Sequence, residues 1–196
     1  MTELIDVTFQ DWVRGESATG ARVKVFERVR DIPYAVIPEL VSPERYWEIL
    51  TIRKGSCTPK HFLLRDMYER LGMMVLYAVY PFRWTELEVD YPPSLRKLAE
   101  DLPLSHHLAC KVDIEGNLVL VDATLDPSLA KLGLPVNKAW DGVSDTLLPL
   151  EPCGEEQLYH PAEAQGMQPP QDEKALAFYR GLNSWLDEVR KLTEPI

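Results

Sequence analysis

Apolar residues recur at helical spacing in the N-terminal part of the chain. Val25, Phe26 and Val29 fall on one face of residues 19–31, which favours a helix that ends before Pro33. A short alternation of valines in the same segment would also suit a strand, but Phe26 and Val29 fit a helix better. The residues before this helix are mixed in character and are interpreted as a short arm.

Further helices are indicated by caps and apolar stripes. Ser42 and Pro43 stand where an N-cap and a first helical residue are favoured, which predicts a short helix over residues 43–50. The end of the chain predicts a long amphipathic helix over residues 172–193 that packs on the core. Its apolar stripe consists of Ala175, Phe178, Leu182, Trp185, Val189 and Leu192.

A flexible turn over residues 55–59 leads into another helix. Leu63, Met67 and Leu71 lie four residues apart on one face of this helix, and Gly72 supplies a left-handed stop.

Apolar, β-leaning runs predict three strands. They cover residues 73–82, 106–112 and 117–123. The Glu-Gly pair at residues 115–116 joins the last two strands as a β-hairpin. Residues 83–103 are acidic and contain prolines, which predicts a loop with a short helix at 94–100. The Pro- and Gly-rich stretch at residues 124–171 is expected to be irregular and to wrap a surface or cover a cleft.

This mixture of elements predicts an α+β fold. At 196 residues the chain is long enough for one sizeable core and short for two. We therefore expect one domain over residues 1–196, with its core at about residues 19–130. An irregular segment at residues 131–171 and the C-terminal helix at 172–193 complete it.

The hairpin register brings a histidine and an aspartate together. If residues 115–116 form a two-residue turn, Ala109 pairs with Asp122. Side chains alternate between faces, so His107 points the same way as Ala109 and becomes a diagonal neighbour of Asp122. His106 points to the opposite face, and a slip of one residue would exchange the two histidines.

Cys57 lies at the mouth of a helix, just before Pro59. Unpaired amide donors and the positive end of the helix dipole favour a thiolate at such a position. Alone, this cysteine would more often be a small buried apolar residue. Together with an imidazole and an orienting carboxylate, however, it supplies the groups that thiol acyl chemistry requires. We therefore predict that Cys57, His107 and Asp122 form a catalytic triad.

Four segments together resemble the transglutaminase-like, papain-related proteins. They are the run from Gly55 to Lys60 before a helix, the strand from His107 to Val112, the run from Val121 to Thr124, and the run from Phe26 to Tyr34. The resemblance covers roughly residues 20–130 in the order Cys, His, Asp. It implies a papain-like core, in which a cysteine-bearing helix packs against an antiparallel sheet, and acyl chemistry on amides: cross-linking, amidation, deamidation or proteolysis.

Two departures keep other readings open. Family members commonly carry an aromatic residue two positions beyond the histidine, where this chain has Ala109, and Lys60 and His61 crowd the helix start. A catalytically silent binding module on the same fold is therefore one alternative. The arylamine N-acetyltransferases, which are similar in triad order, are another. They are usually longer and tend to be glycine-rich after the aspartate, unlike residues 123–127 here.

The expected reaction is a cysteine-dependent acyl transfer or amide hydrolysis through a thioester. Cys57 attacks the acyl carbonyl, and His107, oriented by Asp122, protonates the leaving group and then activates water or an amine. The Cys57 backbone N–H would be one oxyanion donor. Residues 46–53 are the segment considered for the second donor. The substrate is expected to be a protein, a peptide or a small amide or acyl compound.

The composition of the chain makes some classes of partner and location less favourable than others. A formal net charge of −10 disfavours nucleic acid, and no stretch approaches the length of a membrane span. The N-terminal residues lack the pattern of a secretory signal. The chain has only three cysteines, which indicates a reducing compartment, and cytoplasm is expected. No phosphate loop or dinucleotide fingerprint occurs, so no cofactor is expected.

A zinc site is the main alternative to the catalytic triad as an explanation of these histidines and cysteines. Residues 106–110 with His61 or His160 contain zinc-compatible ligands, but no CxxC or HExxH spacing occurs and adjacent strand residues face opposite ways. No metal is therefore expected. Cys110 is interpreted as a buried structural cysteine, His61 is expected to be a solvated helix residue, and the role of Cys153 stays open.

Overall fold

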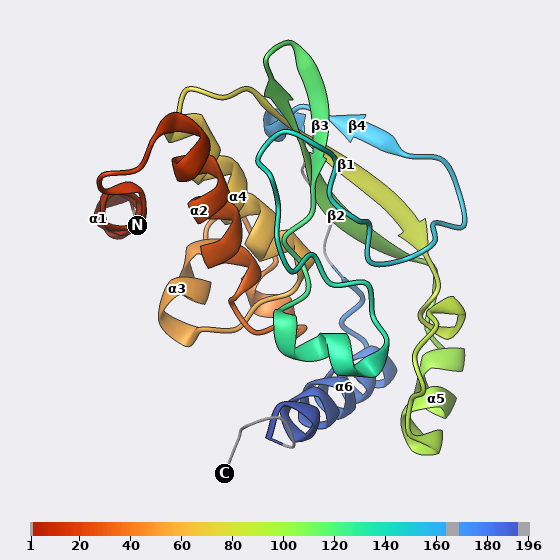
Figure 1. Cartoon of the computed structure of the whole chain (residues 1–196). Coiled ribbons are helices and arrows are strands. Elements are labelled where there is room, and N and C mark those ends of the chain that lie inside the picture. The colour runs from red at the N-terminus through yellow and green to blue at the C-terminus, as the bar shows by residue number, and fades with distance from the viewer. Residues whose placement is uncertain (1, 164–168, 192–196) are drawn as a thin grey trace.

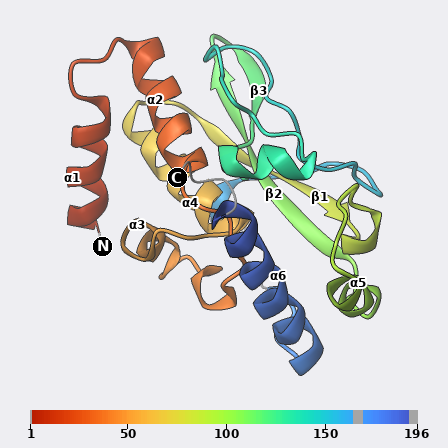
Figure 2. The same cartoon turned by 60° about the horizontal axis from the view of Figure 1, so that its bottom comes forward.

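The computed structural model describes residues 2–163 and 169–191, and it is an α+β protein with a four-stranded antiparallel sheet (Figure 1). The helices α1 to α4 gather on one side of the sheet, whereas α5 and α6 lie toward one end of it (Figures 1 and 2). The α-helices are α1 (Thr2–Val13), α2 (Ala18–Arg30), α3 (Ile49–Ile52), α4 (Cys57–Arg70), α5 (Pro93–Glu100) and α6 (Glu173–Lys191). The strands are β1 (Val75–Phe82), β2 (Ser105–Ile114), β3 (Asn117–Val121) and β4 (Gln157–Tyr159).

The strand order is β3-β2-β1-β4, and the hairpin between β2 and β3 has the predicted register. Ile114 pairs with Asn117, and Val112 pairs with Val119. The two turn residues, at 115–116, both adopt positive φ, at 56° and 86°. This pair of left-handed residues matches the right-handed twist of the two strands, which explains why the two-residue loop fixes the pairing.

Helix α4 packs on β2 and carries the first hydrophobic core. Leu63 and Met67 are completely buried there, as the spacing of apolar residues predicts. The prediction of a left-handed stop is also confirmed, because Gly72 has a φ of 77°. The predicted helix at residues 19–31 corresponds to α2, which lies against α4.

The expectation of an N-terminal arm is wrong, because residues 2–13 form helix α1. Its Ile5 is only 1% exposed, and Phe9, Trp12 and Val13 pack against the first core. These residues recur at intervals of one helical turn, so α1 buries an apolar stripe against α2.

The helix expected at residues 43–50 also differs. Ser42 accepts hydrogen bonds from the backbone N–H groups of Arg45 and Tyr46 through its carbonyl, which closes a tight turn instead of starting a helix. A short 3₁₀-helix, η2 (Tyr46–Glu48), then leads into the single turn of α3.

A second hydrophobic core lies around α6. Phe178 and Leu182 of α6 pack with Trp84 of the 3₁₀-helix η3 (Trp84–Glu86) and with Leu95 of α5. The prediction for α6 is therefore confirmed up to residue 191; residues 192–193 lie outside the described part of the chain. The short helix expected at residues 94–100 is α5.

The stretch expected to be irregular holds one strand that the sequence did not reveal. Strand β4 pairs with the outer side of β1, and only three residues form it. So short an edge strand leaves no periodic pattern to detect. Residues 164–168 of the stretch are outside the described ranges. Across the parts of the chain that the structure describes, no helix combines the length and apolar character needed to cross a membrane.

Candidate active site

Cys57 is the first residue of α4, and its position depends on a close approach of the backbone. A Cβ atom on Gly55 would lie 2.8 Å from the Ile49 side chain, so only glycine fits at this point of the turn. Ser56 is the N-cap residue, but its side chain makes no capping hydrogen bond. The first-turn N–H groups and the helix dipole are thus directed toward the site, where they favour negative charge on the Cys57 sulfur.

His107 and Asp122 meet as the hairpin register predicts. The His107 Nε2 atom lies 2.5 Å from the Asp122 Oδ2 atom, and the two side chains are 4% and 1% exposed. Asp122 follows directly after β3, and its second carboxylate oxygen accepts a hydrogen bond from the Thr124 backbone N–H. Because Asp122 engages Nε2, the Nδ1 atom is the ring nitrogen left to face Cys57.

The Cys57 thiol and the His107 imidazole interact directly. Burial opposes ionisation of Cys57, but a hydrogen bond with His107, the charge of that ring and the Leu108 backbone N–H together lower the pKa of the thiol. Burial likewise opposes the charge on His107, yet Asp122 and Cys57 raise its pKa to about 10. The lowered pKa of Cys57 and the raised pKa of His107 favour the same charge state, in which a Cys57 thiolate lies beside a His107 imidazolium.

His61 is not a solvated residue, contrary to expectation. It is completely buried, its Nδ1 atom lies 2.9 Å from the Cys57 carbonyl oxygen, and its Nε2 atom accepts a hydrogen bond from the Ala123 N–H. Because Nε2 accepts, the proton resides on Nδ1, which donates to the Cys57 carbonyl. Burial lowers the pKa of His61 to about 4. His61 is therefore neutral, and its two hydrogen bonds link the start of α4 to the segment that follows the hairpin.

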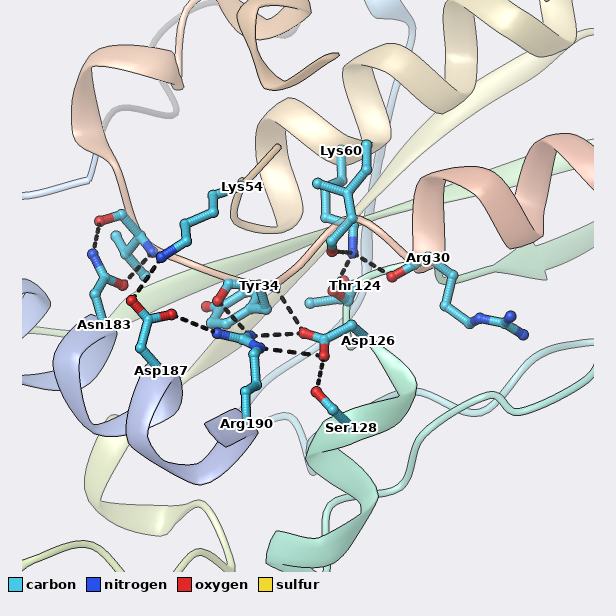
Figure 3. A network of polar contacts seen from close by, with 12 residues as sticks. Arg30, Tyr34, Lys54, Lys60, Thr124, Asp126, Ser128, Asn183, Asp187 and Arg190 are labelled. Carbon is cyan, nitrogen blue, oxygen red and sulfur yellow. Dashed lines mark hydrogen bonds and ion pairs between the residues drawn. The ribbon is translucent and has the colours of Figure 1, made fainter. Parts of the chain in front are cut away.

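Lys60, in the first turn of α4, is another buried residue whose hydrogen bonds link separate segments. Its side chain is 0% exposed, and its ammonium group donates to the backbone carbonyls of Arg30, Ile32 and Thr124 (Figure 3). These carbonyls belong to the end of α2, the loop after it and the segment after Asp122. Lys60 thus joins the three segments around the site, which sequence reasoning did not foresee.

A network centred on Arg190 fixes the loop before the site. Figure 3 shows the Arg190 guanidinium of α6 between Tyr34 and Asp126. Its Nη2 atom lies 2.7 Å from Asp126 Oδ2 and 2.8 Å from the Tyr34 carbonyl oxygen, while the Tyr34 N–H donates to the same carboxylate. Lys54 and Asp187 form a further ion pair between the turn before Cys57 and α6.

These contacts bring Tyr34 to the site. Tyr34 forms an isolated parallel bridge with Gly55, two residues before Cys57. The adjacent backbone also joins, because the Gly55 N–H donates to the Pro33 carbonyl and the Ala35 N–H donates to the Gly55 carbonyl. Tyr34 ends one of the segments that carry the family resemblance, but no pattern singled it out as a site residue.

A cavity of about 540 Å³ opens beside these residues. Cys57, His107 and Tyr34 lie in its wall. Residues from the stretch 124–171, including Leu125 and Leu150, also line it, as expected for a segment that covers a cleft. None of residues 46–53 is among the described lining residues, and the Tyr46 hydroxyl instead donates to Asp66. That segment therefore does not supply the second oxyanion donor.

The remaining candidate ligands are dispersed. His106 is exposed and lies at the cavity wall, His160 is exposed, and Cys110 is fully buried in the first core, as predicted for a structural cysteine. Cys153 is exposed. Within residues 2–163 and 169–191, no group of three or more His, Cys, Asp or Glu side chains is arranged to hold a metal ion.

No family model matches the chain, and neither the curated proteins nor the solved structures contain a match.

Proposed function

We propose that the chain is a cysteine-dependent acyl transferase or amide hydrolase with a papain-like core of the transglutaminase-like kind. The observation that carries the proposal is the contact of Cys57 with His107, whose other ring nitrogen binds the buried carboxylate of Asp122. Cys57, from a helix start, and His107, from a strand, line one cavity, and Asp122, from the end of a hairpin, binds the His107 ring. Burial opposes the charged forms of all three groups, and ionisable groups with such strongly shifted pKa values are typical of reactive sites.

The chemistry follows from the charges. The Cys57 thiolate attacks the acyl carbonyl, forming a C–S bond, and the carbon–nitrogen bond to the leaving amine breaks as the His107 imidazolium gives that amine its proton. Neutral His107 then removes a proton from water or from an acceptor amine, which attacks the thioester and releases Cys57. Asp122 holds the ring in place and stabilises its charged form throughout.

The oxyanion of the tetrahedral intermediate needs two donors. The Cys57 backbone N–H, at the start of α4, is one of them. The Tyr34 hydroxyl is the second in this proposal, because it lines the same cavity and its backbone is fixed beside Gly55. Burial raises the pKa of Tyr34, and negative charge on Cys57 and Asp122 raises it further, so the hydroxyl stays protonated and can donate.

We expect Tyr34→Phe to lower the rate of Cys57 acylation by about 10²-fold without destabilising the fold, because one oxyanion donor is lost. Single-turnover kinetics with an activated ester measure this rate. The matched control is Tyr68→Phe, which removes a buried hydroxyl that donates to the Arg22 carbonyl; neither residue is among the described lining residues of the cavity. Equal rates in the wild type and the Tyr34 variant would remove Tyr34 from the mechanism.

The proposal is tested by mass spectrometry of the protein after exposure to libraries of activated esters and peptide amides. We expect a thioester adduct on the tryptic peptide that contains Cys57. Adducts confined to Cys153 and to surface lysines would contradict the proposed function and would favour a silent binding module on the same fold.

A further inference from the structure

We propose that the acyl group carried by Cys57 is uncharged and apolar, such as a medium-length aliphatic chain. This inference rests on the proposed function and specifies its substrate class. It comes from the composition of the cavity, whose lining joins the polar reactive residues to a large set of apolar and aromatic side chains.

The apolar body of the cavity is built mainly from the second hydrophobic core. Its walls come from α6, from the segment around η3 and from the 3₁₀-helix η4 (Pro127–Leu132) with its flanking residues. The lining residues that form it include Phe82, Trp84, Tyr91, Leu129, Leu182 and Trp185. Such a lining makes hydrophobic contact with any apolar group placed beside Cys57.

Aromatic packing makes this wall rigid. The ring of Trp84 lies 5.1 Å from that of Phe82 and 5.0 Å from that of Phe178, between centroids. The rings of Tyr91 and Trp185 are 5.6 Å apart. Rings interlocked at these distances lose little freedom when a ligand binds, so the cavity is preformed for its occupant.

Several polar lining residues neighbour the triad in the chain, and others belong to β2 and β4. Ser56, Thr58 and Thr124 neighbour the triad in the chain, and His106 lies next to His107. The described lining includes no lysine or arginine, and Glu163 is its only carboxylate, on the exposed surface.

The nearby charges Asp126 and Arg190 bind each other and are not part of the described lining. The cation that does line the cavity, the His107 imidazolium, is already paired with Asp122 and Cys57. A carboxylate or phosphate on the acyl group would therefore enter the cavity without a lysine or arginine partner, which is strongly unfavourable. The absence of lysine and arginine from the described lining also disfavours recognition of a phosphate-bearing acyl carrier inside the cavity.

The size of the cavity agrees with a medium-length chain. A volume of about 540 Å³ falls within the range of small-molecule sites. An acetyl group would leave most of the apolar wall without contact, whereas a longer chain would extend from Cys57 along it. Each buried methylene is expected to raise the specificity for acylation about fourfold, from its transfer free energy.

The test uses p-nitrophenyl acetate, butyrate and octanoate as probes. In the acylation step a bond forms between the ester carbonyl carbon and Cys57 Sγ, the carbon–oxygen bond breaks, and p-nitrophenolate leaves with the electron pair. We expect kcat/KM for p-nitrophenolate release to rise with chain length, with the corresponding acyl group found on Cys57 by mass spectrometry. Acylation of Cys57 at the same efficiency by all three esters would overturn this inference and leave the proposed function intact.

A pair of tryptophan variants separates the cavity from general surface hydrophobicity. Leu87 lines the cavity and is partly buried, so Leu87→Trp is expected to reduce the octanoate-to-acetate ratio by about tenfold or more by filling space needed by the chain. Leu147 is 58% exposed and is not among the lining residues, so Leu147→Trp is expected to leave the ratio unchanged. An equal effect of the two substitutions would contradict the assignment of the cavity.

Binding of octanamide to the Cys57→Ala protein, followed by calorimetry, separates the two proposals. Binding that Leu87→Trp weakens supports the apolar acyl site even if no ester acylates the wild type, in which case only the proposed function fails. No binding of octanamide would overturn the inference regardless of the fate of the esters.

Discussion

Replacement of Cys57 by alanine is expected to lower the single-turnover rate of acyl-enzyme formation by about 10⁴-fold or more. Cys57 is the only cysteine in the described lining of the cavity, and His107 is protonated and held by Asp122, so the thiolate is the group that forms the covalent intermediate. The substitution removes a partly exposed side chain at the first position of α4, so little stability is lost. The rate is measured with an activated ester, and the thermal midpoint verifies the fold.

The chain provides its own control for this substitution. Cys153 is the exposed thiol, and Cys153→Ala is expected to retain the full rate while removing adventitious acylation at the surface. A Cys57→Ala protein that forms the acyl-enzyme at an undiminished rate would show that another residue is the nucleophile.

Replacement of Asp122 by asparagine is expected to lower the same rate by about 10³-fold. The carboxylate raises the pKa of His107 by its charge and its hydrogen bond, and the resulting imidazolium in turn lowers the pKa of Cys57. Without that charge the thiol proton is held more tightly, and the imidazole can adopt the wrong tautomer. The loss is smaller than the roughly 10⁴-fold cost in a serine triad because a thiol ionises more readily than a hydroxyl.

Asp145→Asn is the matched control for the Asp122 substitution. Asp145 is exposed and accepts a hydrogen bond from the Leu120 N–H on β3, an interaction that asparagine can keep. The control should therefore act at the wild-type rate. Rising pH is also expected to restore part of the rate of the Asp122 variant, since more thiolate forms as pH rises. A variant with the wild-type rate at neutral pH would exclude a role for Asp122.

The contact between His107 and Asp122 could be predicted because it depends on local rules. A two-residue turn at 115–116 fixes the hairpin register, and the alternation of strand side chains then decides which histidine faces Asp122. The placement of Cys57 at a helix start likewise followed from neighbouring residues.

The supports of the site could not be predicted, because each joins segments far apart in the sequence. Arg190 is separated from Tyr34 by 156 positions, and Lys60 from Thr124 by 64. A lysine in a helix is ordinarily solvated, and only the meeting of three backbone carbonyls makes its burial tolerable. The burial of His61 could not be predicted for the same reason, since its partner Ala123 is 62 positions away in the chain.

The most direct measurement of the central claim is the pH dependence of Cys57 alkylation by iodoacetamide, followed on its tryptic peptide. The lowered pKa of Cys57 and the raised pKa of His107 predict a thiolate that persists well below pH 7 and reacts there, whereas an ordinary thiol ionises near pH 8.5. Reaction of Cys57 along the same pH curve as a simple thiol such as N-acetylcysteine would contradict the thiolate–imidazolium pair.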